Sequence, residues 1–202
     1  MNFISKTLLS ILIVFSAYHG FAAKSDLEII RQRFITELME PEVNMPLVSN
    51  LMKTIQPDGT WADINYEDVS RTGFQHGEHL SNLVELSRAY KKQNSPLKGD
   101  KQLKKVIYSA LGYWLANDFI CENWWWNQIG TPSALVVVLL IMDEELTKEQ
   151  VAKTLPMVGR AYLEASGARP SGDRIKIAGI LAKSLLFQRK EAEFNDVIRV
   201  IE

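Results

Sequence analysis

The stretch Glu122-Asn123-Trp124-Trp125-Trp126-Asn127-Gln128-Ile129-Gly130-Thr131-Pro132 holds three of the five tryptophans in the chain. Successive side chains point about 100° apart on a helix and to opposite faces of a strand. Neither element can bury three adjacent indole rings. We therefore expect at least one ring to be exposed or to line a cleft.

The residues beside these rings suit a sugar ligand. The flat faces of Trp124, Trp125 and Trp126 can stack on the apolar C–H faces of a pyranose ring, and the amides of Asn123 and Asn127 can bond to hydroxyl groups. The alternative is a corner of the core in which one or two rings pack inward. The composition of the stretch leaves both interpretations open.

Apolar residues recur at helical spacing on both sides of this stretch. Thr131 is the expected N-cap of the helix that follows, with Pro132 in its first turn, and Thr147 and Gln150 form an expected capping box. The first two helices are expected to pair as a hairpin. The pattern predicts helices over residues 25–39, 46–55, 79–90, 103–115, 131–142, 147–163, 175–187 and 190–202.

Nothing in the sequence predicts strand hairpins or a glycine-rich phosphate loop. The predicted fold is therefore all-α, an array of antiparallel helix hairpins. If the longer loops share one rim, they bring together Trp61, the three adjacent tryptophans and residues 167–174.

Composition and charge exclude several functions. The chain has 202 residues, which suggests one domain, and its formal net charge of −1 with no basic run argues against nucleic-acid binding. Cys121 is the single cysteine, so no intramolecular disulfide can form. His76 and His79 lie three residues apart without an identifiable third ligand, so we expect no metal and no cofactor.

The N-terminus has the pattern of a secretory signal. A short polar segment with Lys6 precedes the apolar run 8–17, and Gly20-Phe21-Ala22 places small residues at the positions that direct cleavage after Ala22 or Ala23. The run is short for a membrane span. We therefore expect a signal peptide at 1–23, a secreted or periplasmic mature chain, and no membrane association after cleavage.

Two motifs resemble a known family. Gln56-Pro57-Asp58-Gly59-Thr60-Trp61, and Asn123-Trp124-Trp125 followed by Ile129-Gly130-Thr131-Pro132 and Ala134-Leu135, are similar to the N-terminal α-helical domain of polysaccharide lyase family 8. That family contains the chondroitin AC, hyaluronate and xanthan lyases. The resemblance runs from the first helix to about Ala178. It implies a partial (α/α) toroid, normally followed by β-sandwich domains, in a secreted enzyme.

The resemblance also implies a reaction, the β-elimination of uronate-containing glycans. In the family, a tyrosine removes the C5 proton with help from histidine and arginine. No stretch of this sequence matches those residues, so no catalytic residue is assigned in this chain. The resemblance places Trp124 and Trp125 in a stacking patch, Trp126 at a variable position and Asn127 at a polar cleft position.

This sequence departs from the family pattern in one segment. Relatives carry Thr-Gly-Ala-Asn, whose asparagine binds the uronate carboxylate, whereas here Arg169 follows Ser-Gly-Ala. One register places Arg169 at the asparagine position, and the other places Asp173 there. An ionised Asp173 would repel a carboxylate unless it is protonated or paired, with Arg174 as the nearest cation.

These features give one main hypothesis and two alternatives. The chain stops within the helix array, so residues 24–202 are expected to be the N-terminal part of a longer lyase, truncated before the rest of the toroid and inactive alone. Its expected partners are an acidic polysaccharide of the chondroitin or hyaluronan type and the C-terminal part of the lyase. The alternatives are a non-catalytic glycan-binding protein and a helical module in which the tryptophans anchor a protein partner.

Overall fold

The computed structural model describes residues 25–165 and 172–201, and within these ranges every regular element is a helix. The all-α prediction is thus confirmed. A π-helical turn, η1 (Trp126–Gly130), and a 3-10 turn, η2 (Asp143–Glu145), flank the fifth helix. The α-helices are α1 (Asp26–Leu38), α2 (Met45–Thr54), α3 (His76–Lys91), α4 (Lys101–Asn117), α5 (Thr131–Met142), α6 (Lys148–Val158), α7 (Gly172–Gln188) and α8 (Glu191–Ile201).

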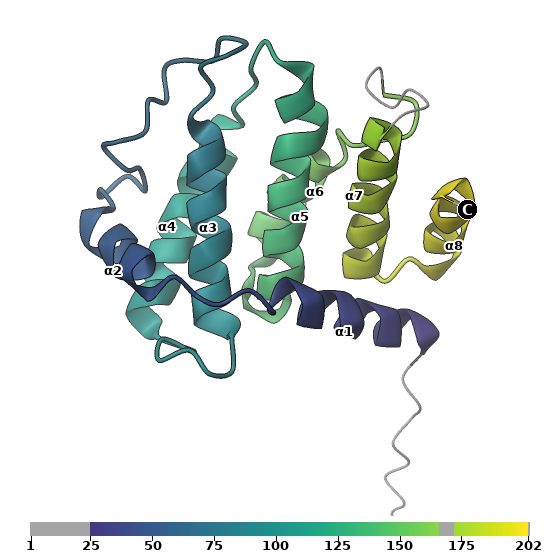
Figure 1. Cartoon of the computed structure of the whole chain (residues 1–202), viewed down its shortest axis with the longest axis horizontal. Coiled ribbons are helices and arrows are strands. Elements are labelled where there is room, and N and C mark those ends of the chain that lie inside the picture. Colours follow the sequence, from purple (N-terminus) through teal and green to yellow (C-terminus); the bar gives the residue numbers. More distant parts are fainter. Residues whose placement is uncertain (1–24, 166–171, 202) are drawn as a thin grey trace, which may run out of the picture.

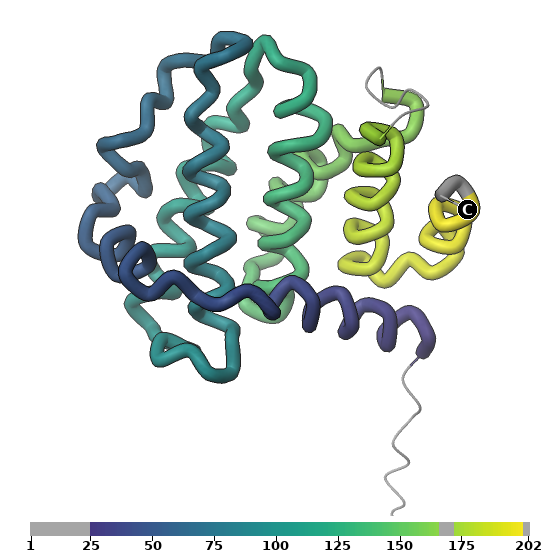
Figure 2. The backbone as a smooth tube through the Cα atoms, in the orientation of Figure 1, coloured from purple at the N-terminus to yellow at the C-terminus, as the bar shows by residue number. Residues whose placement is uncertain are grey.

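The helices form two layers. In Figure 1, α3, α5 and α7 stand side by side in front, with α4 and α6 behind them. Figure 2 shows the chain running alternately down and up through the pairs α3–α4, α5–α6 and α7–α8. Helix α2 packs against α3. The predicted array of antiparallel helix hairpins is therefore confirmed for this part of the chain.

Helix α5 lies at the centre of the array and contacts α3, α6 and α7. Its side chains are apolar on every side, and Leu135, Val138 and Met142 are fully buried. The segment Trp126–Glu145 is long and apolar enough to cross a membrane by composition alone, but over half of its most apolar window is buried inside the protein. A buried core helix has this composition because neighbouring helices cover it all round.

Helix α1 does not form the expected hairpin with α2. Residues 39–44 carry the chain away from α1, which crosses the base of the array and packs against α5 and α7 (Figure 1). Leu27 of α1 joins Leu186 of α7 and Phe194 of α8 in a second, smaller core. The hairpin prediction was wrong because helical spacing defines an apolar face without defining its partner.

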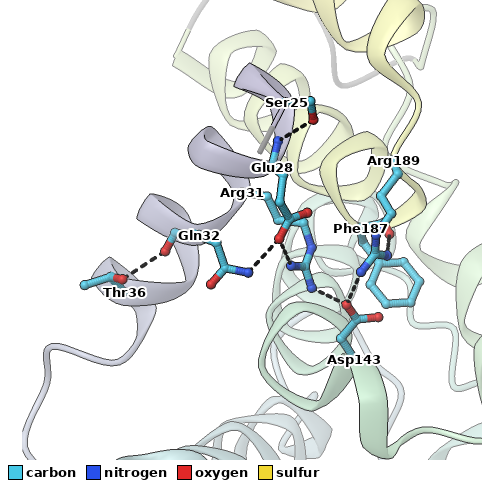
Figure 3. A network of polar contacts seen from close by, with 8 residues as sticks. All are labelled: Ser25, Glu28, Arg31, Gln32, Thr36, Asp143, Phe187 and Arg189. Carbon is cyan, nitrogen blue, oxygen red and sulfur yellow. Dashed lines mark hydrogen bonds and ion pairs between the residues drawn. The ribbon is translucent and has the colours of Figure 1, made fainter. Parts of the chain in front are cut away.

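A charged network fixes the junction at the base. Asp143 accepts hydrogen bonds from Arg31 of α1 and, at 2.7 Å, from Arg189 at the end of α7 (Figure 3). Glu28 adds a second carboxylate 2.9 Å from Arg31 Nη1. The Arg31 side chain is only 6% exposed, so its charge depends on these two partners.

Side-chain caps set several helix starts. Ser25, Asn44 and Asp100 accept backbone N–H groups at the starts of α1, α2 and α4. Thr147 and Gln150 form the predicted capping box at α6, with bonds of 3.1 and 2.9 Å. These caps satisfy amides that have no partner within their helix.

The connections over residues 55–75 and 118–125 reach the same end of the array (Figure 1), whereas residues 166–171 of the third predicted loop lie outside the described residues. The backbone N–H of Glu122 donates to the Val69 carbonyl over 3.0 Å, and Arg160 pairs with Asp118 at 2.7 Å, which links three connections at this end. Trp61 does not belong to this surface. Its ring is 1% exposed and its indole N–H donates to the Leu51 carbonyl.

Candidate functional site

The three tryptophans lie in a helical turn, not in the loop that the sequence predicts. Asn123 begins the turn by accepting the Trp125 backbone N–H at 3.1 Å. The π-helical turn η1 follows, and the Thr131 N–H donates to the Trp126 carbonyl five residues earlier. Thr131 is therefore not the N-cap of α5, and its hydroxyl is buried with no hydrogen-bond partner among the described residues.

Proline explains the wide turn. Pro132 has no N–H to donate to Gln128, and in an ordinary α-helix its ring would press on that carbonyl. A π-helical turn before the proline relieves this conflict while the helix continues. Thr131-Pro132 predicts a helix start because proline favours first turns, and this prediction is wrong: the pair marks a change of helical pitch within a continuing helix.

The three rings occupy different environments, as expected for adjacent indole rings that cannot all be buried. Trp124 is 38% exposed, whereas Trp125 and Trp126 are half-buried. The rings of Trp125 and Trp126 meet edge to face, with centroids 5.2 Å apart and planes at 86°. This angle makes a corner of two flat apolar surfaces.

Trp126 fits into a slot between two glycines. A Cβ on Gly77 of α3, or on Gly130 of η1, would overlap the Trp126 ring. Phe74 supports the same ring from the preceding loop, with centroids 5.5 Å apart. Trp126 therefore wedges between α3 and α5, and its position follows from the missing side chains at 77 and 130.

Trp125 and Trp126 line a hollow that we name the α5–α7 cleft. Its volume is about 440 Å³, and it lies between the first turns of α3, the start of α5 and one face of α7. Leu80, Trp125, Trp126, Val137, Lys176 and Lys183 are among its lining residues. Apolar walls with a few charged groups are typical of ligand sites.

A second hollow shares Gly77, Ser81 and Trp126 with the α5–α7 cleft, and we name it the acidic hollow. It has a volume of about 450 Å³ and is lined by Asp68, Glu78, Gln75 and Asn65 as well as Trp126. Neither lysine nor arginine is among its lining residues in the described part of the chain. Trp126 therefore lines two hollows of different charge.

The amides of Asn123 and Asn127 brace the turn. Asn127 donates to the Cys121 carbonyl at 2.7 Å and accepts the Cys121 N–H at 3.0 Å, and Asn123 donates to the Arg71 carbonyl at 3.4 Å. Cys121 itself is buried, and burial raises the pKa of its thiol. Each amide can still form a further hydrogen bond. The contacts of these two amides with a sugar therefore stay a prediction.

Asp173 and Arg174 are not among the described residues that line the α5–α7 cleft. Asp173 is 3.0 Å from Lys176 Nζ, and Arg174 donates to the Leu163 carbonyl at 3.3 Å. Both residues belong to the first turn of α7. Arg169 lies outside the described residues, so the choice between Arg169 and Asp173 stays a prediction.

Sequence reasoning missed the cleft face of α7. Lys176, Gly179, Ile180 and Lys183 are spaced i, i+3, i+4 and i+7, which places them on one side of the helix. Such a face with lysine at both ends and glycine between them is visible in the sequence. The apolar pattern of residues 175–187 predicts a helix there without identifying this face as part of a cleft.

The two histidines serve the core and do not form a metal site. His79 Nε2 donates to the Ala110 carbonyl at 3.0 Å, so its Nδ1 accepts from the Tyr66 hydroxyl at 2.9 Å. Burial lowers the pKa of His79 to about 4 and raises the pKa of Tyr66 to about 12. His76 donates from Nε2 to the Tyr66 carbonyl, and the described residues contain no cluster of three metal-binding side chains. Both histidine rings are fully buried.

Known proteins with a similar sequence or structure are lyases. Chondroitinase-AC of Pedobacter heparinus is 36% identical over 116 residues, which is 57% of this chain and 17% of that protein. A chondroitinase AC lyase solved with oligosaccharides superposes with a TM-score of 0.77 and 30% identity, over 86% of this chain and 26% of that one. Paenibacillus xanthan lyase has a TM-score of 0.64 at 23% identity, over 83% of this chain and 18% of its own, and supports the fold alone.

The chain thus spans about a quarter or less of the length of these relatives. The family described as polysaccharide lyase family 8, N-terminal alpha-helical domain, matches residues 36–178. This range contains the Asn-Trp-Trp and Ile-Gly-Thr-Pro motifs, and the helix hairpins form part of the (α/α) toroid of such lyases. The protein belongs to polysaccharide lyase family 8, and the matched residues form its N-terminal α-helical domain.

Proposed function

We propose that the chain binds an acidic polysaccharide of the chondroitin or hyaluronan type in the α5–α7 cleft. The observation that carries this proposal is the corner made by Trp125 and Trp126 on the wall of a hollow of about 440 Å³. Indole faces stack on sugar rings, and a hollow of this volume is in the range of small-ligand sites. Family membership and the similarity to chondroitinases AC support the choice of glycan.

In this proposal the chain supplies the stacking wall of a polysaccharide lyase and does not cleave the glycan by itself. No segment of the sequence matches the family's tyrosine, histidine and arginine. β-Elimination needs a base at the C5 proton and a group that holds the developing charge. Arg169 or Asp173 remains our candidate for the contact with the uronate carboxylate.

Two assays test this proposal with the purified chain. Titration with chondroitin and hyaluronan is expected to change tryptophan fluorescence saturably, whereas a neutral glucan is expected to leave it unchanged. Absorbance of unsaturated uronate products is expected to stay at the background rate. If none of the glycans alters the fluorescence or shows heat of binding, the proposed function is wrong.

A protein partner is the second candidate, because apolar side chains gather at the loop end. Ile120 is 49% exposed, Trp124 38%, Tyr162 47% and Ile175 62%. Exposed aromatic and aliphatic side chains of this kind anchor protein interfaces. The resemblance places Trp124 in the stacking patch, but Trp124 is not among the residues that line the α5–α7 cleft. Trp124→Ala therefore separates the two functions: in our proposal it leaves glycan affinity within about twofold and weakens binding of a protein partner.

We also propose that the chain is exported and that its leader is removed after Ala22 or Ala23. The support is the sequence pattern of residues 1–23, which lie outside the described residues. N-terminal sequencing of the secreted protein should begin at Ala23 or Lys24. Recovery of the full chain, starting at Met1, from the cytoplasm would contradict this proposal.

A further inference from the structure

Two lysines on α7 point to the kind of sugar that the cleft accepts. Lys176 and Lys183 both line the α5–α7 cleft. Their spacing of seven residues places them two turns apart on one helix face, about 10.5 Å along the axis. Gly179 lies between them, and an added Cβ there meets no atom within 4 Å. The floor of the cleft between the two ammonium groups is therefore open.

The lysines differ in how their charges are balanced. Lys176 pairs with Asp173 at 3.0 Å, but the side chains are 55% and 31% exposed, so water weakens this pair. Lys183 is partly buried, and among the described residues its ammonium has neither an ion pair nor a hydrogen bond. A partly buried cation without a partner, on the wall of an open hollow, favours an anionic ligand.

The charges that surround the cleft also favour an anionic ligand. No carboxylate is among the described residues that line the α5–α7 cleft. The acidic hollow carries Asp68 and Glu78 instead. An anionic sugar stacked on the tryptophan corner is therefore attracted toward α7 and repelled by the carboxylates of the acidic hollow.

We propose that Lys183, assisted by Lys176, forms a subsite for the anionic oxygen group of a sugar stacked on Trp125 and Trp126. The anion is a uronate carboxylate or a sulfate ester. The carboxylates in the lining of the neighbouring acidic hollow favour a sugar orientation in which the anionic edge faces α7. This inference rests on the proposed glycan-binding function and adds the residue that selects charged sugars.

The test compares two variants and three ligands. Lys183→Met keeps the aliphatic stem and removes the charge, and Lys101→Met makes the same change at an exposed position on α4. Circular dichroism first checks that both variants fold. Calorimetry then gives their affinities for unsulfated chondroitin, sulfated chondroitin and carboxyl-reduced chondroitin, which keeps the sugar backbone without the charge.

Lys183→Met removes a charge-assisted hydrogen bond to the glycan. We therefore expect this variant to bind unsulfated chondroitin more weakly, on the order of tenfold. Lys101→Met is expected to leave it within about twofold, as surface charge far from a site contributes little. The carboxyl-reduced glycan should bind weakly and equally to the wild type and to Lys183→Met. If only the sulfated glycan depends on Lys183, the subsite holds a sulfate.

Two results would overturn the inference. Equal losses in Lys183→Met and Lys101→Met would mean that net charge alone attracts the glycan. Equal affinity of the wild-type chain for native and carboxyl-reduced chondroitin, with no dependence on sulfate, would leave glycan binding intact and remove the anionic subsite. Absence of binding to every glycan would instead refute the proposed function and the subsite together.

Discussion

Trp126 lies against Gly77 so closely that a single methyl group on residue 77 would overlap its indole ring. The contact joins α3 to the π-helical turn before α5. It therefore determines both the wall of the α5–α7 cleft and the boundary with the acidic hollow. The glycine at 77 is a requirement of this packing and not of its backbone angles, since only Gly59 and Gly99 among the described glycines have positive φ.

Alanine at three glycines should separate packing from helix propensity. Gly77→Ala and Gly130→Ala force Trp126 out of its slot, and overpacking of this kind costs about 1–3 kcal/mol. Gly179→Ala faces open space in mid-helix and should stabilise the chain by up to about 1 kcal/mol. Urea unfolding followed by fluorescence measures all three. Equal effects of Gly77→Ala and Gly179→Ala would refute the slot.

Asn127 is expected to hold the tryptophan turn through its two bonds to Cys121. Asn127→Ala removes both bonds and should lower the free energy of unfolding by about 1–3 kcal/mol. Asn94→Ala, at an exposed position, should change it by less than about 0.5 kcal/mol. Similar small values for both variants in chemical denaturation would show that the brace contributes nothing.

Asp143 is expected to hold α1 onto the array. Asp143→Asn leaves the nearly buried Arg31 with Glu28 alone and should cost about 2–4 kcal/mol. Arg31→Met combined with Asp143→Asn should cost less than the sum of the single changes. Asp196→Asn, in an exposed pair with Arg199, should cost under about 0.5 kcal/mol. Additive losses at 31 and 143 would contradict this coupling.

Acid should weaken the fold through His79. Its folded pKa of about 4 lies below the ordinary value of 6.5, so the unfolded chain binds the proton first as the pH falls. Stability from this residue is complete above pH 6.5 and decreases down to about pH 4, by about 3 kcal/mol at most. Burial lowers the pKa of His76 as well, with the same sign.

The measurement for this prediction is urea unfolding at several pH values between 7.5 and 4.5. His79→Gln keeps a donor for the Ala110 carbonyl and removes the titration, so its stability should depend less on pH than that of the wild type. An equally steep loss in both proteins would assign the acid sensitivity to other groups.

The sequence is sufficient to predict the helices and several of their caps, because these depend on neighbouring residues. The capping box of Thr147 and Gln150 is such a case. The packing of α1 against α5 and α7 could not be predicted, since an apolar helix face does not name its partner. The π-helical turn also escaped prediction, because Pro132 suits a first helical turn as well as a change of pitch.

The candidate site was predictable in part for the same reason. Three adjacent indoles must leave one ring uncovered wherever they lie, so the aromatic surface follows from local geometry. The slot formed by Gly77 and Gly130, and the approach of Lys183 to the tryptophans, depend on which helices become neighbours. Pairwise tertiary contacts of this kind are not encoded in the spacing of one helix.

The most direct test of the central claim is calorimetric titration of the Gly179→Leu variant with chondroitin oligosaccharides. A Cβ at position 179 meets no atom within 4 Å and faces the open floor of the α5–α7 cleft, so we expect the leucine variant to fold with unchanged or higher stability. If the cleft is the glycan site, the wild-type chain binds and Gly179→Leu loses affinity by at least about tenfold. Undiminished binding by a folded Gly179→Leu variant would place the glycan elsewhere and contradict the account.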